Sequence, residues 1–370
     1  MGMGMERGRQ IRPMTVDDIP QVGRLFYKIF RKRTISSSNA FNDYFEQLFF
    51  GSPIYQQQHG SIVHETPSGQ ISSVISAVPM QYVVDGEIIT ARLLCAFMTD
   101  PDMRCHGAAE LALILRPRNQ DLCFTDSASP ASAGAFKAAR AALLPVHGLD
   151  WCRIFQPAAF FAQLAARRST LGRYAARLPI ARPLDHIVRR MTPALHVEPG
   201  TGIHDEAMST DLFVSTVQDF LSAYPVRPVW SPAELNWILD IARQNTGLGD
   251  LNIRSVWNRN AELIGCFIYF GRPGMIAQVL NVFSRKGEEA VVINRMMYHL
   301  EQSGLVAARG HVQPGQLDAL SRQRAMVYRH RAHTCVSTRH PGVLNAINRN
   351  DIYVGGLAGE SWSRLVSDFF

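Results

Sequence analysis

Residues 97–109 read Phe-Met-Thr-Asp-Pro-Asp-Met-Arg-Cys-His-Gly-Ala-Ala. The apolar start predicts the end of a strand, Asp100-Pro101-Asp102 predicts a turn, and Gly107-Ala108-Ala109 predicts the start of a helix. Small residues at a helix start let backbone N–H groups approach an anion, and the helix dipole favours negative charge there. Arg104 and His106 would add hydrogen-bond donors. The segment therefore predicts a phosphate-binding loop between a strand and a helix.

The residues around this loop predict a regular succession of strands and helices. A strand is expected at Ile11-Arg12-Pro13, and Thr15-Val16-Asp17-Asp18 has the spacing of a helix N-cap with an acid at the third helical position. Asp85-Gly86 between apolar runs indicates a hairpin. The further elements expected in the first half are a helix at 45–50, strands at 60–64, 72–84 and 88–99, a helix at 107–115, a strand at 122–125, a helix at 131–144 and a strand at 151–155.

The second half predicts the same order of elements with little sequence identity, which suggests a divergent structural duplication. Its expected elements are helices at 208–222 and 232–244, strands at 252–258, 261–270 and 275–283, a helix at 288–302, a strand at 305–312, a helix at 316–329 and a strand at 334–337. Residues 352–362 alternate like a last strand followed by an exposed turn. We expect this segment to close the edge of the core or to line a cleft for a substrate.

These elements predict an α+β protein built from two layered domains, each a mixed, mostly antiparallel sheet flanked by helices. A chain of 370 residues with 46% hydrophobic content is long enough for two cores. The expected division is a disordered tail at 1–10, a first domain at 11–157, a helical linker at 158–205 and a second domain at 206–370.

The net charge and the spacing of the cysteines indicate which partners and metal sites to expect. The formal charge of +7 predicts a surface that attracts anions. Nucleic acid is an unlikely partner, since the arginine-rich helices lack interleaved aromatic residues for base stacking. Six cysteines without a Cys-x-x-Cys pair favour reduced thiols over a zinc site or disulfides, so we expect no metal. Without a signal-peptide core or a membrane-length apolar run, a cytoplasmic protein with no membrane span is expected.

The loop Arg104-Cys105-His106-Gly107-Ala108-Ala109, placed after a three-strand meander, resembles the pyrophosphate loop of the GNAT superfamily of acyl-CoA N-acyltransferases. The resemblance extends over about residues 10–157 and includes the capped first helix. It implies that acetyl-CoA or another acyl-CoA lies where the fourth and fifth strands splay apart. Phe97, Met98 and Thr99 would then pair with the pantetheine amides, and the amides from Arg104 to Ala109 would hold the pyrophosphate.

The resemblance also implies direct attack of an amine on the thioester, which needs alignment, oxyanion stabilisation and a base. Asp126 is the candidate base or amine-binding group, although it would equally serve as a helix cap for 130–144. Many relatives carry a tyrosine general acid in the pattern Asn-x-x-Ala-x-x-x-Tyr. Here Ser129, Ser132 and Phe136 stand at that spacing, so Ser127, Ser129 or solvent would have to protonate the leaving thiolate.

The position in the second half that corresponds to the loop reads Ser284-Arg285-Lys286-Gly287-Glu288-Glu289. Two acids at a helix start would repel a pyrophosphate. This predicts a degenerate second copy that contributes substrate surface, as in tandem members of the superfamily.

The leading hypothesis is transfer of an acetyl or longer acyl group from acyl-CoA to an amine on a small molecule, an amino sugar or a peptide. Two alternatives stay open. One is a non-catalytic ligand sensor or scaffold that keeps the fold. The other is a tRNA-dependent aminoacyltransferase, which the basic surface would suit. The sequence leaves the acceptor, the acyl chain length and the oligomeric state open.

Overall fold

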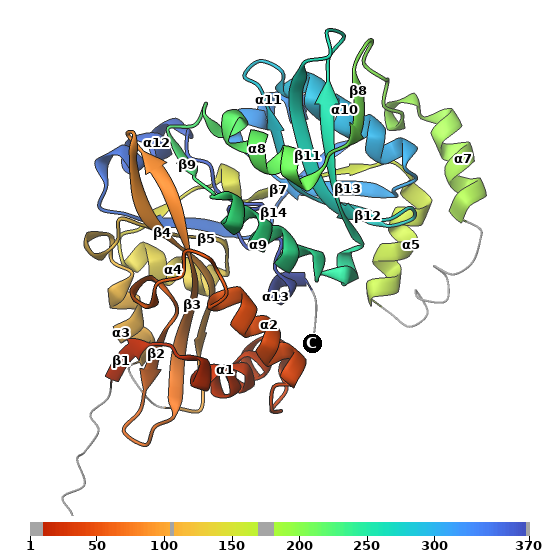
Figure 1. Ribbon diagram of the computed structural model, residues 1–370. Coiled ribbons are helices and arrows are strands. Elements are labelled where there is room, and N and C mark those ends of the chain that lie inside the picture. The colour runs from red at the N-terminus through yellow and green to blue at the C-terminus, as the bar shows by residue number, and fades with distance from the viewer. Residues whose placement is uncertain (1–9, 104–106, 169–180, 368–370) are drawn as a thin grey trace, which may run out of the picture.

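Two mixed β-sheets flanked by helices organise the chain (Figure 1). The computed structural model describes residues 10–103, 107–168 and 181–367. The first sheet contains, from edge to edge, β1 (Gln10–Pro13), β2 (Ile62–Glu65), β3 (Ile71–Val84), β4 (Glu87–Thr99), β5 (Leu122–Ala128), β15 (His333–Ser337) and β6 (Ala142–Leu143), with β9 (Val226–Pro228) paired to β3. The second contains β14 (Met326–His330), β7 (Leu149–Ile154), β13 (Ala307–His311), β12 (Ile276–Ser284), β11 (Leu263–Gly271), β10 (Asp250–Trp257) and β8 (His204–Ala207).

The helices cover both sheets and connect them. They are α1 (Ile19–Phe26) with a π-helical turn (Tyr27–Arg31), α2 (Asn39–Phe49), α3 (Gly107–Ile114), α4 (Pro130–Ala138), α5 (Pro157–Arg168), α7 (Ala181–Met191), α8 (Thr210–Leu221), α9 (Pro232–Arg243), α10 (Glu289–Gln302), α11 (Leu317–Ser321), α12 (Pro341–Arg349) and α13 (Arg364–Ser367). Most pairings in the two sheets are antiparallel, and β4–β5 and β12–β13 are parallel. The predicted fold class is confirmed.

Two short sequence motifs form the hairpin turn and the helix start that they predict. Asp85 and Gly86 have φ angles of 52° and 86°, the left-handed values that a tight hairpin needs, and they connect β3 to β4 in the register Val84↔Glu87. Thr15 and Asp18 form a reciprocal capping box at the start of the first helical segment. The hairpin fixes the long β3–β4 pair on which the first sheet is built.

Equivalent strands occupy equivalent places in the two sheets. From one edge, β1, β2, β3, β4 and β5 correspond to β8, β10, β11, β12 and β13. The next place in each sheet belongs to a strand from the other half, because β15 lies between β5 and β6 while β7 lies between β13 and β14. The sequence assigns the predicted strands 151–155 and 334–337 to their own halves, whereas hydrogen bonding places each in the opposite sheet. Each half therefore contributes one strand to the sheet of the other half.

A continuous hydrophobic core joins the two halves. It includes side chains of α1, α2, β3 and β4 together with side chains of α8, α9, β11 and the segment after α12. Figure 1 shows α9 and α13 in the space between the two sheets. Trp237 of α9 donates a hydrogen bond from Nε1 to the backbone oxygen of Gln47 at 3.2 Å, and its ring lies edge-on to Trp362 at 5.7 Å. The junction is packed like a domain interior.

Four local predictions differ from the structure. The predicted helix 316–329 ends at Ser321, and residues 326–330 form β14 because they pair with β7. The predicted helix 131–144 ends at Ala138, where Arg140 turns the chain with φ 67° into β6. Gln10, assigned to the tail, is the first residue of β1. The exposed turn expected within 352–362 is buried throughout.

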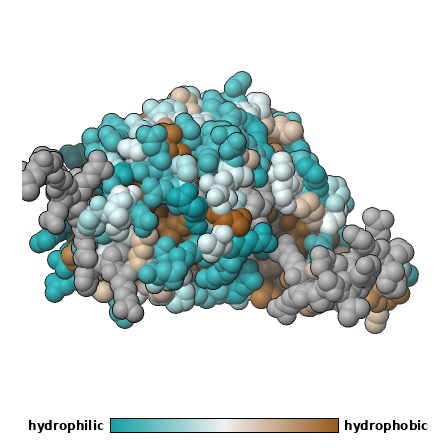
Figure 2. All heavy atoms as spheres, turned by 90° about the horizontal axis from the view of Figure 1, so that it is seen from below, coloured by the Kyte–Doolittle hydropathy of each residue, from teal (hydrophilic) through white to brown (hydrophobic). Residues whose placement is uncertain are grey.

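The described surface carries little contiguous apolar area on the face shown in Figure 2, where hydrophobic residues form small, separate areas among hydrophilic ones. None of the helices in the described ranges is long and apolar enough to cross a membrane. Among the same residues, we find no group of three or more His, Cys, Asp or Glu side chains placed to hold a metal ion.

The exchanged strands predict that the two halves unfold together. Val336 of β15 is 1% exposed. Val336→Ala removes buried methyl groups from this strand, which belongs to the second half and pairs within the first sheet. We expect a loss of about 2 kcal/mol in the free energy of unfolding, with one cooperative transition in urea followed by both circular dichroism and tryptophan fluorescence.

The matched control is Val327→Ala in β14, whose side chain is 54% exposed. This variant should unfold within about 0.5 kcal/mol of wild type. Two separate transitions, with only one shifted by Val336→Ala, would contradict the mutual completion of the sheets.

Candidate functional site

The parallel strands β4 and β5 open into a gap at their carboxyl ends. Their pairing covers only Ala91↔Leu122, Arg92↔Cys123 and Leu93↔Phe124. Beyond Leu93, β4 continues to Thr99 against β3, and β5 continues to Ala128 against β15. The two edges that face one another past this point have no strand partner within the described ranges. Backbone groups there are available to an extended ligand.

A β-bulge marks the point of divergence. In the β3–β4 register, Ser76 pairs with Ala96 and Ala77 pairs with Leu94, so Cys95 is the extra residue. A bulge bends its strand and increases the local twist. Because the bulge lies two residues after the last β4–β5 pair, it directs β4 away from β5.

The gap leads into a cavity of about 570 Å³. Its wall combines apolar side chains of α1, the π-helical turn, α4 and β4, and of Leu115 just after α3, with polar groups of β5 and of the C-terminal segment. The lining residues are Phe26, Ile29, Phe30, Arg31, Leu94, Cys95, Ala96, Phe97, Leu115, Thr125, Ser127, Ala128, Ser129, Ala131, Ser132, Phe136, Arg331, Ala332, Glu360, Leu365 and Val366. The cavity is an apolar channel with a polar floor, as small-molecule sites commonly are.

The residues expected to contact the pantetheine lie along this gap. Phe97 lines the cavity, Met98 is buried in the core on the other side of the strand, and Thr99 ends β4. All three pair with β3 on one edge only. Their backbone therefore presents the edge that the sequence predicts for a ligand.

The predicted phosphate loop is described at its helical end. Arg104, Cys105 and His106 lie outside the described residues. Gly107 begins α3 and is buried, Ala108 is half-buried and Ala109 is exposed. A Cβ atom on Gly107 would lie 2.7 Å from the His64 ring. This glycine is required for the close approach of α3 to the sheet.

The structure places Asp126 and Ser127 at the end of β5, beside the cavity. Asp126 is 3% exposed, and its Oδ2 atom has no hydrogen-bond partner in the part of the chain that the structure describes. The alternative role of helix cap belongs to Ser129, whose side chain accepts a hydrogen bond from the backbone of Ser132. Ser127 is half-buried and lines the cavity, as does Phe136, at the position where the resemblance implies a tyrosine. Asp126 is thus free for a role other than capping.

Several polar residues of the cavity were not predicted from the sequence, among them Cys95, Arg331 and Glu360. Burial, with Glu360 and Asp126 close by, raises the pKa of the Cys95 thiol well above its usual range, so Cys95 stays protonated and is a poor nucleophile. Arg331 donates from Nη2 to the backbone oxygen of Asp126 at 2.7 Å. Arg331 and Glu360 lie more than 200 residues from Asp126 in sequence. Spacing along the chain gives no signal for such neighbours.

In the second half, the parallel strands β12 and β13 diverge in the same way. Side chains of this half bond to the backbone there. The β12–β13 pairing ends at Val279↔Gly310, and Leu280 is the extra residue of a bulge against β11. Gln316 donates from Nε2 to the Val282 backbone oxygen at 2.6 Å, on the edge that corresponds to β4 in the first half. The Glu289 carboxylate accepts the Gly287 N–H at 2.9 Å at the corresponding helix start. Internal side chains therefore bond to backbone at both places, and a cavity of about 320 Å³ lies beside Val282, Glu289 and Gln316.

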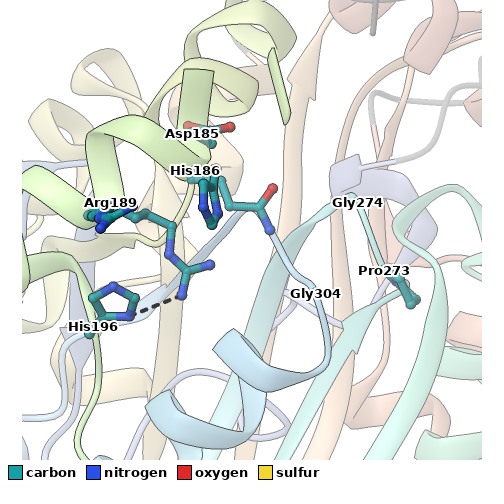
Figure 3. A pocket seen from close by; sticks show the side chains of 9 residues that line it. Asp185, His186, Arg189, His196, Pro273, Gly274 and Gly304 are labelled. Atoms are coloured by element: carbon teal, nitrogen blue, oxygen red, sulfur yellow. Dashed lines mark hydrogen bonds between the residues drawn. The ribbon is translucent and has the colours of Figure 1, made fainter. Parts of the chain in front are cut away.

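A larger cavity of about 750 Å³ lies elsewhere, between α7 and the Pro273–Gly274 turn (Figure 3). Asp185 and Arg189, two of its charged residues, already have structural partners. Asp185 accepts the Ala158 backbone N–H at 2.6 Å at the start of α5. Arg189 forms an ion pair with the buried Glu301 and contacts His196. The β4–β5 cavity differs from this larger cavity in combining open backbone edges with Glu360, a buried glutamate whose Oε1 atom has no hydrogen-bond partner among the described residues.

Comparison with known proteins identifies the fold. No protein-family model matches the sequence, and no curated protein matches it. Among solved structures, it is similar to a probable N-acyltransferase from Enterococcus faecalis, with 11% identity over 89% of this chain and 71% of that one and a TM-score of 0.57. It is also similar to GCN5-related N-acetyltransferases from Anabaena variabilis (11% identity, 89% and 72% covered, TM-score 0.55) and Kribbella flavida (10% identity, 89% and 70% covered, TM-score 0.51). The chain has the GNAT fold.

The close approach at Gly107 yields a test of the α3 start. In Gly107→Ala, the new Cβ would lie 2.7 Å from His64 and 3.0 Å from Ser73 Oγ, so α3 must shift. We expect a loss of about 1–3 kcal/mol in the free energy of unfolding, measured in urea.

Gly134→Ala in α4 is the matched control, because nothing lies within 4 Å of its added Cβ. Removing a glycine from a helix interior should stabilise the protein by about 0.5–1 kcal/mol. Equal effects of the two substitutions would show that α3 does not depend on this contact.

Proposed function

We propose that this protein is an acyl-CoA-dependent N-acyltransferase that moves an acetyl or longer acyl group to an amine. The observation that carries the proposal is the open β4–β5 gap, whose unpaired strand edges lead into a cavity with a polar floor. The GNAT fold of its structural neighbours supports acyl transfer in general. A reaction of this kind needs two substrates held in line, which a cleft between two strands provides.

In the proposed complex, the backbone of Phe97, Met98 and Thr99 pairs with the pantetheine amides, and the segment from Arg104 to Ala109 binds the pyrophosphate. The start of α3 supplies N–H groups and the positive end of a helix dipole. Acetyl-CoA or a longer acyl-CoA serves as cosubstrate, and no metal takes part. Asp126 and Ser127 lie where the thioester would end, beside the acceptor amine.

The second half is proposed to be a degenerate copy that supplies acceptor-binding surface. Gln316 and Glu289 occupy the positions that a pantetheine and a pyrophosphate would need there. We therefore expect one acyl-CoA per chain, with a small molecule, an amino sugar or a peptide amine as acceptor. We expect a cytoplasmic location.

A second candidate is a sensor or scaffold that binds acyl-CoA without turnover. Phe136 favours it, since the hydroxyl of a tyrosine general acid is absent from the cavity wall. Solvent or Ser127 would protonate the thiolate in the enzyme, whereas neither is needed in the sensor. Binding without release of free CoA over a broad panel of amines would favour the sensor.

Isothermal titration with acetyl-CoA and longer acyl-CoAs tests the proposed site. We expect binding at one site per chain in wild type. Ala131→Trp places a large side chain on an exposed position of α4 that lines the cavity, so affinity should fall at least about tenfold, equivalent to about 1.4 kcal/mol.

Ala138→Trp on the same helix is the control, because Ala138 is exposed and lies away from the cavity lining. It should bind like wild type. Absence of binding to every acyl-CoA at high micromolar concentration would reject the proposed function.

A further inference from the structure

A glutamate from the C-terminal segment reaches the floor of the β4–β5 cavity. Glu360 follows α12 by eleven residues, yet it lies beside Asp126 of the first sheet. Its side chain is 2% exposed and lines the cavity with Thr125 and Cys95. It is an acid that the sequence analysis did not assign to any role.

The polar contacts of these two acids leave hydrogen-bonding capacity unused. Asp126 Oδ1 accepts the backbone N–H of Glu360 at 3.3 Å. Asp126 Oδ2 and Glu360 Oε1 are both buried without a hydrogen-bond partner among the described residues. Buried carboxyl oxygens are normally paired, so the unused capacity of Glu360 at the cavity wall indicates a ligand that donates hydrogen bonds.

The charges around Glu360 favour its neutral form in the empty protein. Burial, followed by the nearby Asp126 carboxyl, raises the pKa of Glu360 well above its usual range, and the Arg331 guanidinium opposes this shift. The other titratable group facing it is the protonated thiol of Cys95 on β4. A carboxyl with a raised pKa is a stronger base once it ionises, which suits it to receive a proton from an ammonium group.

The backbone around Glu360 is held in place by contacts to both halves. Gly359 packs so closely on Asp126 that a Cβ there would lie 2.1 Å from Oδ2. Ser361 contacts His311 Nε2 at 2.7 Å, and His311 Nδ1 lies 3.1 Å from Asp150 of β7. This chain of contacts fixes the residue after Glu360 to an exchanged strand. The carboxyl is thereby positioned by tertiary structure.

We propose that Glu360 is the catalytic base of this acyl transfer, that Asp126 is its positioning residue, and that the acceptor therefore enters as a protonated primary amine. The proposal rests on the proposed function. Glu360 takes one proton from the ammonium nitrogen, and the neutral amine attacks the thioester carbon. The new N–C bond forms, the C–S bond breaks, and the nitrogen's second proton passes through Ser127 or solvent to the CoA thiolate. Glu360 then releases its proton to solvent.

The decisive experiment compares wild type with Glu360→Gln, an isosteric change that removes the base. Binding of acetyl-CoA is measured by isothermal titration, and thiol release from acetyl-CoA is followed with a panel of primary amines and with water as the only acceptor. We expect acetyl-CoA affinity within about threefold of wild type and turnover reduced by roughly 100-fold or more. Wild-type kcat/KM should rise with pH as Glu360 ionises, and Glu360→Gln should lose this rise.

Two further variants separate positioning from folding. Asp126→Asn removes the neighbouring charge, so the rising limb of the pH profile should move to lower pH while acetyl-CoA binding persists. Glu234→Gln is the control, since Glu234 of α9 is a buried glutamate whose pKa is raised to about 7 by burial and which lies outside the cavity. It should leave turnover and its pH profile unchanged.

These measurements distinguish failure of the proposed function from failure of the role of Glu360. If wild type binds no acyl-CoA, the proposed function and this inference fall together. If wild type binds and turns over acetyl-CoA while Glu360→Gln keeps its rate and pH profile, only the role of Glu360 is overturned. Binding without thiol release from either amine or water also overturns that role and favours the sensor.

Discussion

Where a sheet opens between two strands, the backbone N–H and C=O groups on the facing edges lose their strand partners and need others. This constraint governs the architecture of the two sheets. β4 keeps its outer edge paired with β3, while β5 keeps its own with β15. Since β15 comes from the other half, the first sheet can hold its gap open only when the whole chain is folded. The bulge at Cys95 then sets where the gap begins.

The two halves show how one architecture supports different outcomes. Both have a parallel strand pair that ends near a bulge, at Leu93 in one half and at Val279 in the other. In the second half, Gln316 bonds to the open strand edge and Glu289 bonds to the helix-start backbone. Internal side chains therefore bond there to backbone groups that the first half leaves for a ligand, and a smaller cavity of about 320 Å³ lies beside Gln316 and Glu289.

The polar floor of the cavity is assembled from segments that are distant in the chain. Asp126 lies near the end of β5, Arg331 lies between β14 and the exchanged strand β15, and Glu360 lies in the C-terminal segment. Their proximity follows from the strand exchange, which also brings Asp150 to His311 and Ser361. Burial and the neighbouring Asp126 carboxyl raise the pKa of Glu360 well above its usual range, which sets Glu360 apart as the proposed proton acceptor.

The sequence by itself determined the α+β class, the β3–β4 hairpin at Asp85-Gly86 and the strand-to-helix change near Gly107, because each depends on local periodicity or turn chemistry. It also pointed to Asp126. Only the tertiary structure decided that residues 326–330 form a strand, that β7 and β15 change sheets, and that Glu360 faces Asp126. Those features depend on partners more than 150 residues away, and local propensity carries no information about such contacts.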